Sequence, residues 1–463
     1  MQQKQFLNKM GVMPVGKLML SMGVPMILSM VLQAVYNIVD SAFVSNIPQS
    51  GELALNALTL AFPVQILMVA VGIGTGVGAN ALLAKRLGEG DSETVNKTAG
   101  NAFFLGFVIC ILCILFGVFG VRRYISSQTA NAQITQMAVD YLHICCIVSF
   151  GVIFFSLFEK LLQATGRSLY STIAQIAGAV TNIILDPILI YGLLGLPELG
   201  VKGAAYATVI GQIVSALLGL LFHFKLNREI DNHFKYLKPD VRTIREIYAI
   251  GLPAIIAQAL MSFMTYGLNI ILIRIDEAVV TAYGLYYKIQ QFLLFAAFGL
   301  RDAITPIVSF NHGMRNEARI KAGIRYGMVY TLVIMAVGTV ALELFASQFA
   351  SIFGLSGQTQ ELCVSAIRVI SLSFVFAGAN IAFQGIFQAL DGGLESLVVS
   401  VCRQLIFVLP VAWIFSSIVG QSLDSVWLVW STFLIAEILS AVIAVLFMRR
   451  IAKTRLRPRS SAN

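Results

Sequence analysis

The sequence predicts an all-α integral membrane protein with twelve transmembrane helices arranged in two six-helix lobes. Only 12% of the 463 residues are charged and 58% are hydrophobic, whereas a soluble domain carries about 25% charged residues. Twelve apolar runs are each long enough to cross a bilayer, which takes about 20 residues. The chain also matches itself at an offset of 225 residues. This composition excludes a water-soluble enzyme, a secreted disulfide scaffold and a disordered regulator.

The twelve expected spans follow one another with short connections. No small-residue cleavage site follows the first apolar run, so we expect that run to be a membrane span and not a removed signal peptide. The expected spans are 18–44, 56–82, 99–121, 138–163, 172–194, 203–224, 247–273, 280–310, 326–347, 362–390, 397–417 and 426–448.

The basic residues predict the orientation. With the N-terminus inside, 24 of the 32 Lys and Arg residues fall in cytoplasmic segments and four in outer loops, which is a strong positive-inside bias. We therefore expect a multi-pass protein of the cytoplasmic (inner) membrane with both termini in the cytoplasm. The basic tail 449–463 is expected to contact membrane lipids, and no nucleic-acid partner is expected. The protein is expected to be a monomer.

An internal repeat predicts the domain organisation. Five residues of the first half recur 225 positions later: Phe158, Gln163, Ala164, Leu169 and Ser171 match Phe383, Gln388, Ala389, Leu394 and Ser396. Six spans return the chain to its starting side, so the lobes have one orientation and a pseudo-two-fold axis along the membrane normal. Such parallel repeats are typical of transporters that rock two bundles about a central site. We expect an N-terminal lobe (1–224), a cytoplasmic linker (225–246), a C-terminal lobe (247–448) and the tail.

Asp186 is the clearest ionisable residue inside a predicted span, and such residues are costly and usually functional. Asn182 lies four residues earlier on the same helix face. Pro187 cannot donate a backbone hydrogen bond, so it is expected to kink the helix and free a carbonyl. These groups predict a site for a proton or a small hard cation. The alternative is a kink satisfied by neighbouring helices, with the aspartate paired to a base.

The second half lacks this chemistry, because Phe407 and Val411 stand 225 positions after Asn182 and Asp186. A structural role would more naturally be kept in both lobes, so the pair is expected to serve a one-sided task such as ion coupling. Asp40 lies toward the outer end of span one, with Asn37 one turn before it. On the residues alone, Asp40 is as consistent with an ordinary interface carboxylate as with a site.

Other polar residues support weaker expectations. Lys288 is expected to line a cavity or to pair with an acid such as Glu437, and the adjacent Arg301 and Asp302 to lie at the cytoplasmic water boundary. Glu159 and Lys160 are expected near a membrane interface, where long side chains snorkel. The six cysteines are expected to be small core residues. The glycine run 72–80 lacks the Lys-Ser/Thr of a phosphate cradle, so ATP is not the expected energy source.

The chain resembles the multidrug and toxic compound extrusion (MATE) transporters over nearly its whole length. In the first half the matching stretches are VPMILSMVLQAVYNIVDSAFVS, GIGTGVGANALLAKRLGEGD and TNIILDPILIYGLLGLPELGVKGAAYATVIGQ; in the second half they are GLRDAITPIVSFNHGMRN and FQALDGG. The resemblance implies a two-lobed, V-shaped bundle that works by alternating access. It also implies export of organic cations and other amphipathic drugs, driven by entry of H⁺ or Na⁺ and without a cofactor or a metal beyond that ion.

The resemblance also implies particular site residues. Family members with an acidic N-terminal lobe use an Asp on span one, an Asn and an Asp on span five and a Thr on span six, a pattern that falls on Asp40, Asn182, Asp186 and Thr208. Thr208 on its own would be explained by close helix packing. Gln33, Asn37 and Lys288 are the expected substrate-cavity residues.

The sequence departs from the family pattern at Gln163-Ala164-Thr165-Gly166, at Arg301-Asp302 and at Lys288, which leaves the substrate open. Three alternatives stay open as well. A lipid-linked oligosaccharide flippase of the same superfamily would have extra spans or an arginine-rich cavity. A membrane-integral enzyme would need a His/Asp or Ser/Lys cluster at one depth. A passive channel fits two six-span lobes less well than a rocking transporter does.

Overall fold

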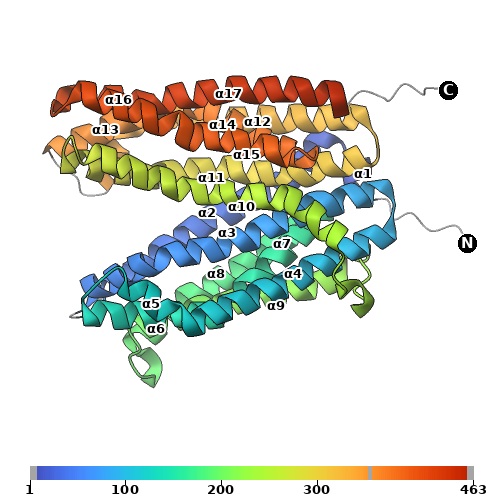
Figure 1. Cartoon of the computed structure of the whole chain (residues 1–463), viewed down its shortest axis with the longest axis horizontal. Coiled ribbons are helices and arrows are strands. Elements are labelled where there is room, and N and C mark those ends of the chain that lie inside the picture. Colours follow the sequence, from blue (N-terminus) through green and yellow to red (C-terminus); the bar gives the residue numbers. More distant parts are fainter. Residues whose placement is uncertain (1–7, 49, 353–356, 456–463) are drawn as a thin grey trace, which may run out of the picture. The chain divides into compact units, whose positions relative to one another are not determined.

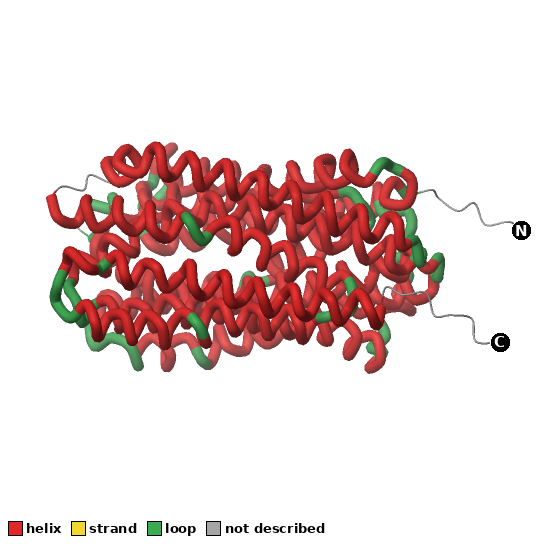
Figure 2. Tube along the Cα trace, turned by 90° about the horizontal axis from the view of Figure 1, so that it is seen from above, coloured by secondary structure: helices red, strands yellow, loops and turns green. Residues whose placement is uncertain are grey.

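The computed structural model describes residues 8–48, 50–352 and 357–455, and within these ranges the chain forms helices and no strands. Figure 2 shows long helices with loops gathered at their ends. The helices form two compact units. The first unit holds the residues up to Val12 together with Leu28–Ile255, and the second holds Met13–Ile27 together with the chain from Ile256 onward. The lobe boundaries at 224 and 246 stay a prediction.

The first unit contains most of α2 and all of α3 to α9 (Figure 1). Its elements in chain order are α1 (Lys9–Val12), α2 (Val15–Ser45), α3 (Gly51–Glu89), α4 (Ser92–Phe119), α5 (Val121–Ser126), α6 (Ala132–Ile147), α7 (Phe150–Ala164), α8 (Ser168–Tyr191), the short η1 (Leu193–Gly195), α9 (Val201–Leu226) and η2 (Phe234–Leu237).

The second unit contains the remaining helices, and α10 contributes to both units. Its elements are α10 (Val241–Leu272), α11 (Glu277–Gly313), α12 (Glu317–Ile352), α13 (Gly357–Ser371), α14 (Phe374–Ala389), α15 (Gly393–Val401), the π-helical turn η3 (Cys402–Ile406), α16 (Val408–Val419), η4 (Leu423–Ser425) and α17 (Trp427–Arg455). Residues 449–455 of the predicted tail belong to α17, and 456–463 lie outside the described residues.

Ten helices are long and apolar enough to span a membrane, and two bent helix pairs bring the number to twelve. The predicted spans 138–163 and 362–390 are these bent pairs. The first bends by 47° between α6 and α7, and the second by 54° between α13 and α14. Counted as one span each, the two bent pairs agree with the twelve predicted spans. The helices after the two breaks begin at Phe150 and Phe374, 224 positions apart, so the break is itself part of the repeat.

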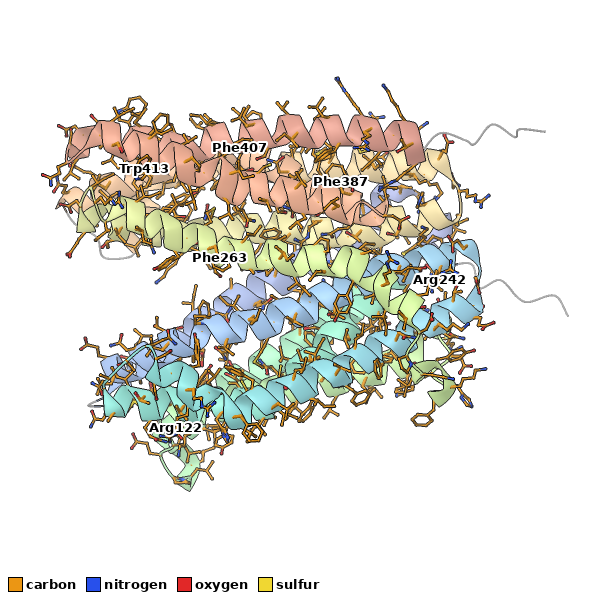
Figure 3. The ribbon with its side chains drawn as sticks, in the orientation of Figure 1. Arg122, Arg242, Phe263, Phe387, Phe407 and Trp413 are labelled. Carbon is orange, nitrogen blue, oxygen red and sulfur yellow. The ribbon has the colours of Figure 1, made fainter. Side chains whose placement is uncertain are left out.

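The burial pattern suits a lipid environment. Large apolar side chains face outward, as with Phe119 (71% exposed) and Trp413 (53% exposed; Figure 3). Polar side chains lie inside, as with the buried Asn80 and Asn101. The cysteines are free and apart from the half-buried Cys113 they are buried, which confirms that they are core residues.

The predicted linker is bound to the first unit. The side chains of Asn96 and Asn101 on α4 accept hydrogen bonds from the backbone N–H groups of Asp231 (2.7 Å) and Asp240 (2.8 Å). Asp240 then precedes α10 and accepts hydrogen bonds from the hydroxyl and the backbone N–H of Thr243, which lower the pKa of Asp240. The linker is thus fixed by specific contacts, and its polar composition serves these contacts.

Candidate functional site

The predicted coupling residues lie where the backbones of α8 and α9 are in close contact. A Cβ atom added to Gly178 would lie 2.5 Å from the carbonyl oxygen of Gly211, and one added to Gly203 would lie 2.4 Å from that of Leu189. Small residues permit such close approach of helices in membranes. The polar residues of α8 are thereby held against α9.

Asn182 and Asp186 share one face of α8, as predicted. Both are buried, with exposures of 2% and 0%, and Nδ2 of Asn182 donates a hydrogen bond of 3.3 Å to Oδ1 of Asp186. The helix runs through Pro187 to Tyr191 without interruption. The kink at Pro187 therefore stays a prediction.

Asp40 of α2 reaches the same place. The carboxyl groups of Asp40 and Asp186 lie close enough to influence each other electrostatically. Tyr191 holds the two helices together nearby, because its hydroxyl donates a 2.6 Å hydrogen bond to the carbonyl oxygen of Phe43.

Each of the four predicted coupling residues has one buried oxygen without a hydrogen-bond partner in the described part of the chain. These atoms are Oδ1 of Asp40, Oδ1 of Asn182, Oδ2 of Asp186 and Oγ1 of Thr208. A buried polar atom left unpaired costs about 1–3 kcal/mol, so such atoms are rare and call for an explanation. Carboxylate, amide and hydroxyl oxygens are the ligands that hard cations prefer, and a carboxylate also accepts a proton. The residues present therefore fit either H⁺ or Na⁺.

A cavity of about 100 Å³ opens beside this cluster within the first unit. Asn182 and Thr208 belong to both the cluster and the cavity wall. The volume is enough for a few water molecules. The wall includes Gln33, a predicted cavity residue, and it also includes Glu159 and Lys160.

Two wall residues escaped the sequence interpretation. Gln175 of α8 accepts a hydrogen bond from the hydroxyl of Ser29 and donates one of 3.5 Å to Oε1 of Gln33, so it joins α8 to α2. Tyr36 lies one helical turn before Asp40 and also lines the cavity. Gln33, Tyr36 and Asp40 are spaced so that they share one side of α2, and this pattern could have identified Tyr36 from the sequence.

Two expectations about neighbouring charged residues are wrong. Glu159 and Lys160 are buried (8% and 2% exposed), not snorkelling at an interface. Arg301 and Asp302 form a 2.8 Å ion pair, and their side chains are only 14% and 4% exposed, so they are not at a water boundary.

Lys288 does not pair with Glu437, because that carboxylate is bound to Arg403 by contacts of 2.7 to 3.1 Å. The side chains of Lys288 and Asn37 are exposed. Their role in a substrate cavity stays a prediction.

The second unit contains a cavity at repeat-equivalent positions. Leu294, Phe298, Ala377, Arg403 and Glu437 line it, and they stand 225 positions after Val69, Ile73, Val152, Gly178 and Gln212 of the first cavity.

The chemistry of this second cavity differs. Arg403, on the π-helical turn, holds Glu437 with two nitrogens, and Nδ2 of Asn380 donates to Oε2 of Glu437 at 2.7 Å. Phe407, which is labelled in Figure 3, stands 225 positions after Asn182. The second cavity therefore contains a buried ion pair, and Oε1 of Gln404 in its wall is also buried without a hydrogen-bond partner among the described residues. No cluster of three His, Cys, Asp or Glu residues suited to a metal ion occurs among the described residues.

Comparisons with known proteins identify relatives of this chain. The chain is 26% identical over 435 residues to the multidrug export protein MepA of Staphylococcus aureus (strain MRSA252), covering 94% of each chain. It is 25% identical over 434 residues to MepA of Staphylococcus saprophyticus, covering 94% of this chain and 93% of that protein.

Among solved structures, a multidrug resistance MATE transporter of the MOP superfamily in an outward-facing conformation matches with a TM-score of 0.88 and 25% identity, covering 95% of this chain and 97% of that one. A MATE crystal structure in complex with MaL6 matches with a TM-score of 0.89 and 24% identity, covering 96% and 99%. These likenesses support the two-lobed, twelve-helix membrane fold.

The MatE family model matches the chain twice, at residues 25–188 and 253–414. The two matches begin 228 positions apart and end 226 apart, which agrees with the internal repeat. Together they cover well over half of the chain, which therefore belongs to the MatE family of membrane transporters.

Proposed function

We propose that this protein is a secondary active multidrug exporter that exchanges organic cations or amphipathic drugs for H⁺ or Na⁺ by alternating access. Asp40, Asn182, Asp186 and Thr208 are its coupling site. The observation that carries this proposal is the set of four unpaired buried oxygens, one on each of these residues. An incoming cation or proton would satisfy them.

The geometry suggests how ion entry is linked to substrate release. Ion uptake removes the repulsion between the carboxylates of Asp40 and Asp186, which lie on α2 and α8. These helices can then pack more closely around the neutralised pair. That change alters the adjoining cavity, and a ligand shifts such an equilibrium only by its differential affinity for the two states. Ion and drug need not be bound together.

The setting of this activity follows from the charge pattern. We place both termini in the cytoplasm and the protein in the inner membrane as a monomer. Membrane lipids contact its exposed apolar side chains, and neither a cofactor nor a nucleic acid takes part. An oligosaccharide flippase is not favoured, since the lining of the first cavity includes one lysine and no arginine among the described residues.

The test is gradient-driven export of ethidium from proteoliposomes by Asp186→Asn. We expect export to fall to background while the protein still inserts, because the amide cannot release and rebind a proton or neutralise Na⁺. Asp140→Asn is the matched control in the same lobe, since its carboxylate pairs with Lys202 at 3.3 Å and accepts a 2.9 Å hydrogen bond from Gln136 on a partly exposed surface. Export by Asp186→Asn at the wild-type rate would sink the assignment.

The ion itself is identified by imposing one gradient at a time. A Na⁺ gradient at fixed pH is followed by a pH gradient at equal Na⁺. Export that responds to one gradient and ignores the other assigns the coupling ion.

A further inference from the structure

A third carboxylate, which the proposed function does not use, lines the first cavity together with two of the coupling residues. Glu159 and the adjacent Lys160 lie on α7, five and four residues before its end at Ala164. Both line the same cavity as Asn182 and Thr208. Burying a carboxylate and an ammonium group is costly, and ionisable groups within membrane spans usually serve a function.

The two charges are connected through an amide. Nζ of Lys160 donates a 3.1 Å hydrogen bond to Oε1 of Gln163, and Nε2 of Gln163 donates a 3.0 Å hydrogen bond to Oε1 of Glu159. The side chain of Asn80 on α3 fixes this part of α7 by donating to the carbonyl oxygen of Lys160 at 2.9 Å. Glu159 is therefore held in place while remaining part of the cavity wall.

Polar side chains occupy the wall between the two charged regions. They come from α2, α7, α8 and α9 and comprise Gln33, Ser156, Gln175, Gln212 and Ser215. Along α8, the 11 residues from Gln175 to Asp186 correspond to about 16 Å at 1.5 Å per residue. This wall offers oxygen atoms to a cation along a large part of the span.

The internal repeat shows whether the position of Glu159 requires a carboxylate for packing. Gln384 and Gly385 stand 225 positions after Glu159 and Lys160, whereas Gln163 recurs as Gln388. Gln384 is 4% exposed and donates to the hydroxyl of Ser400 at 2.9 Å. A neutral amide thus satisfies the same packing position in the second lobe. At this repeat position, a carboxylate occurs only in the lobe that carries Asn182 and Asp186.

We propose that Glu159 is an inner binding site for the coupling cation, the last carboxylate that H⁺ or Na⁺ meets before it leaves the first cavity at the cytoplasmic side. This inference rests on the proposed function, because it extends the path that begins at Asp40 and Asp186. The ammonium group of Lys160 repels an arriving cation, so the ion stays only briefly. The other titratable group of the cavity wall is Tyr36, and His223 of α9 packs against the ring of Phe158, the residue directly before Glu159.

The experiment compares two measurements on Glu159→Gln in the full chain. The amide keeps an oxygen that accepts the hydrogen bond of Gln163, so the fold is spared while the charge is lost. We expect gradient-driven ethidium export in proteoliposomes to fall at least tenfold. Displacement of bound ethidium by acid or Na⁺ in detergent should keep its midpoint within twofold, because the outer site is intact.

Three further variants make the result decisive. Glu159→Asp restores a carboxylate and should export at least threefold faster than Glu159→Gln. Glu343→Gln is the matched control, since that half-buried carboxylate accepts a hydrogen bond from Ser371 (2.7 Å) outside both cavities. Asp186→Asn should lose both displacement and export.

Each outcome is assigned to one hypothesis. Export by Glu159→Gln within twofold of wild type overturns the inner site, and so does loss of displacement along with export. No advantage of Glu159→Asp over Glu159→Gln also overturns it. Normal displacement by Asp186→Asn contradicts the proposed function instead, so the two failures are distinguishable.

Discussion

Gly178 of α8 and Gly211 of α9 pack backbone against backbone beside the proposed coupling residues. A Cβ atom on Gly178 would lie 2.5 Å from the carbonyl oxygen of Gly211, and one on Gly211 would lie 2.6 Å from the carbonyl oxygen of Gly178. Asn182 lies one turn beyond Gly178, and Thr208 lies almost one turn before Gly211. This helix spacing is what allows Asn182 and Thr208 to line one small cavity.

Gly178→Ala should separate the two helices. The new methyl group meets a backbone atom, which cannot rotate away, and overpacking of this kind costs about 1–3 kcal/mol. We expect a lower thermal midpoint in detergent together with weaker ion-triggered displacement of ethidium. Gly284→Ala is the control, because a Cβ there meets nothing within 4 Å. Equal behaviour of the two variants would show that the close contact has no role in the site.

Thr208→Val should weaken binding of the coupling ion without lowering the thermal stability of the protein. Oγ1 of Thr208 is buried and unpaired, so replacing the hydroxyl by a methyl group should leave thermal stability unchanged or raise it by up to about 1 kcal/mol. The coupling ion loses an oxygen ligand, so its apparent affinity in ethidium displacement should fall at least fivefold. Thr432→Val is matched, since its Oγ1 is also buried and unpaired but lies on α17. A drop in ion affinity for both variants would contradict a ligand role that is specific to Thr208.

Arg403→Leu should destabilise the protein strongly, because it leaves the carboxylate of Glu437 buried without its cation. Breaking a buried ion pair costs about 3–5 kcal/mol, whereas replacing both members by apolar residues is often neutral. We therefore expect a large fall in thermal midpoint for the single variant and recovery in Arg403→Leu/Glu437→Leu. The double variant should still couple ethidium export to the ion gradient. A stable double variant without coupling would place part of the coupling chemistry in the second lobe.

Tyr191→Phe should loosen the C-terminal end of α2. Its hydroxyl donates the 2.6 Å hydrogen bond to the carbonyl oxygen of Phe43, three residues beyond Asp40, and such a bond contributes about 0.5–1.5 kcal/mol. We expect a modest loss of thermal stability and a clearer loss of ion affinity. Tyr170→Phe on the same helix is the comparison, because its ring packs on Phe222 with centroids 5.3 Å apart. If both variants keep wild-type ion affinity, the Tyr191 hydrogen bond does not position Asp40.

Composition and periodicity predicted the membrane class and the number of spans, because both depend on long-range averages of hydrophobicity. They missed the breaks between α6 and α7 and between α13 and α14. Neither break contains a proline or a run of polar residues, so the apolar pattern continues across it. The bends arise from packing within each lobe, which a single stretch of sequence does not encode.

The candidate site was predicted only in part, because contacts between distant residues cannot be read from a single stretch of sequence. Asn182 and Asp186 stand out because a polar pair four residues apart is rare in an apolar helix. Glu159 and Lys160 were predicted at an interface, since distance from a helix end says nothing about which neighbours cover a side chain. Arg403 was not connected to Glu437 because they are 34 residues apart and meet only in the folded lobe.

The contrast between the two cavities has an electrical consequence. A charge that travels about 16 Å along α8 crosses roughly half of a hydrocarbon core about 30 Å thick. A full crossing changes the energy by about 2.3 kcal/mol per 100 mV, so this path corresponds to about 1.2 kcal/mol. In the second lobe, Arg403 and Glu437 neutralise each other and no net charge moves. If the ion follows the proposed path, the membrane voltage acts on the first lobe, and export of an uncharged drug should speed up on an inside-negative potential even when the ion concentrations are equal.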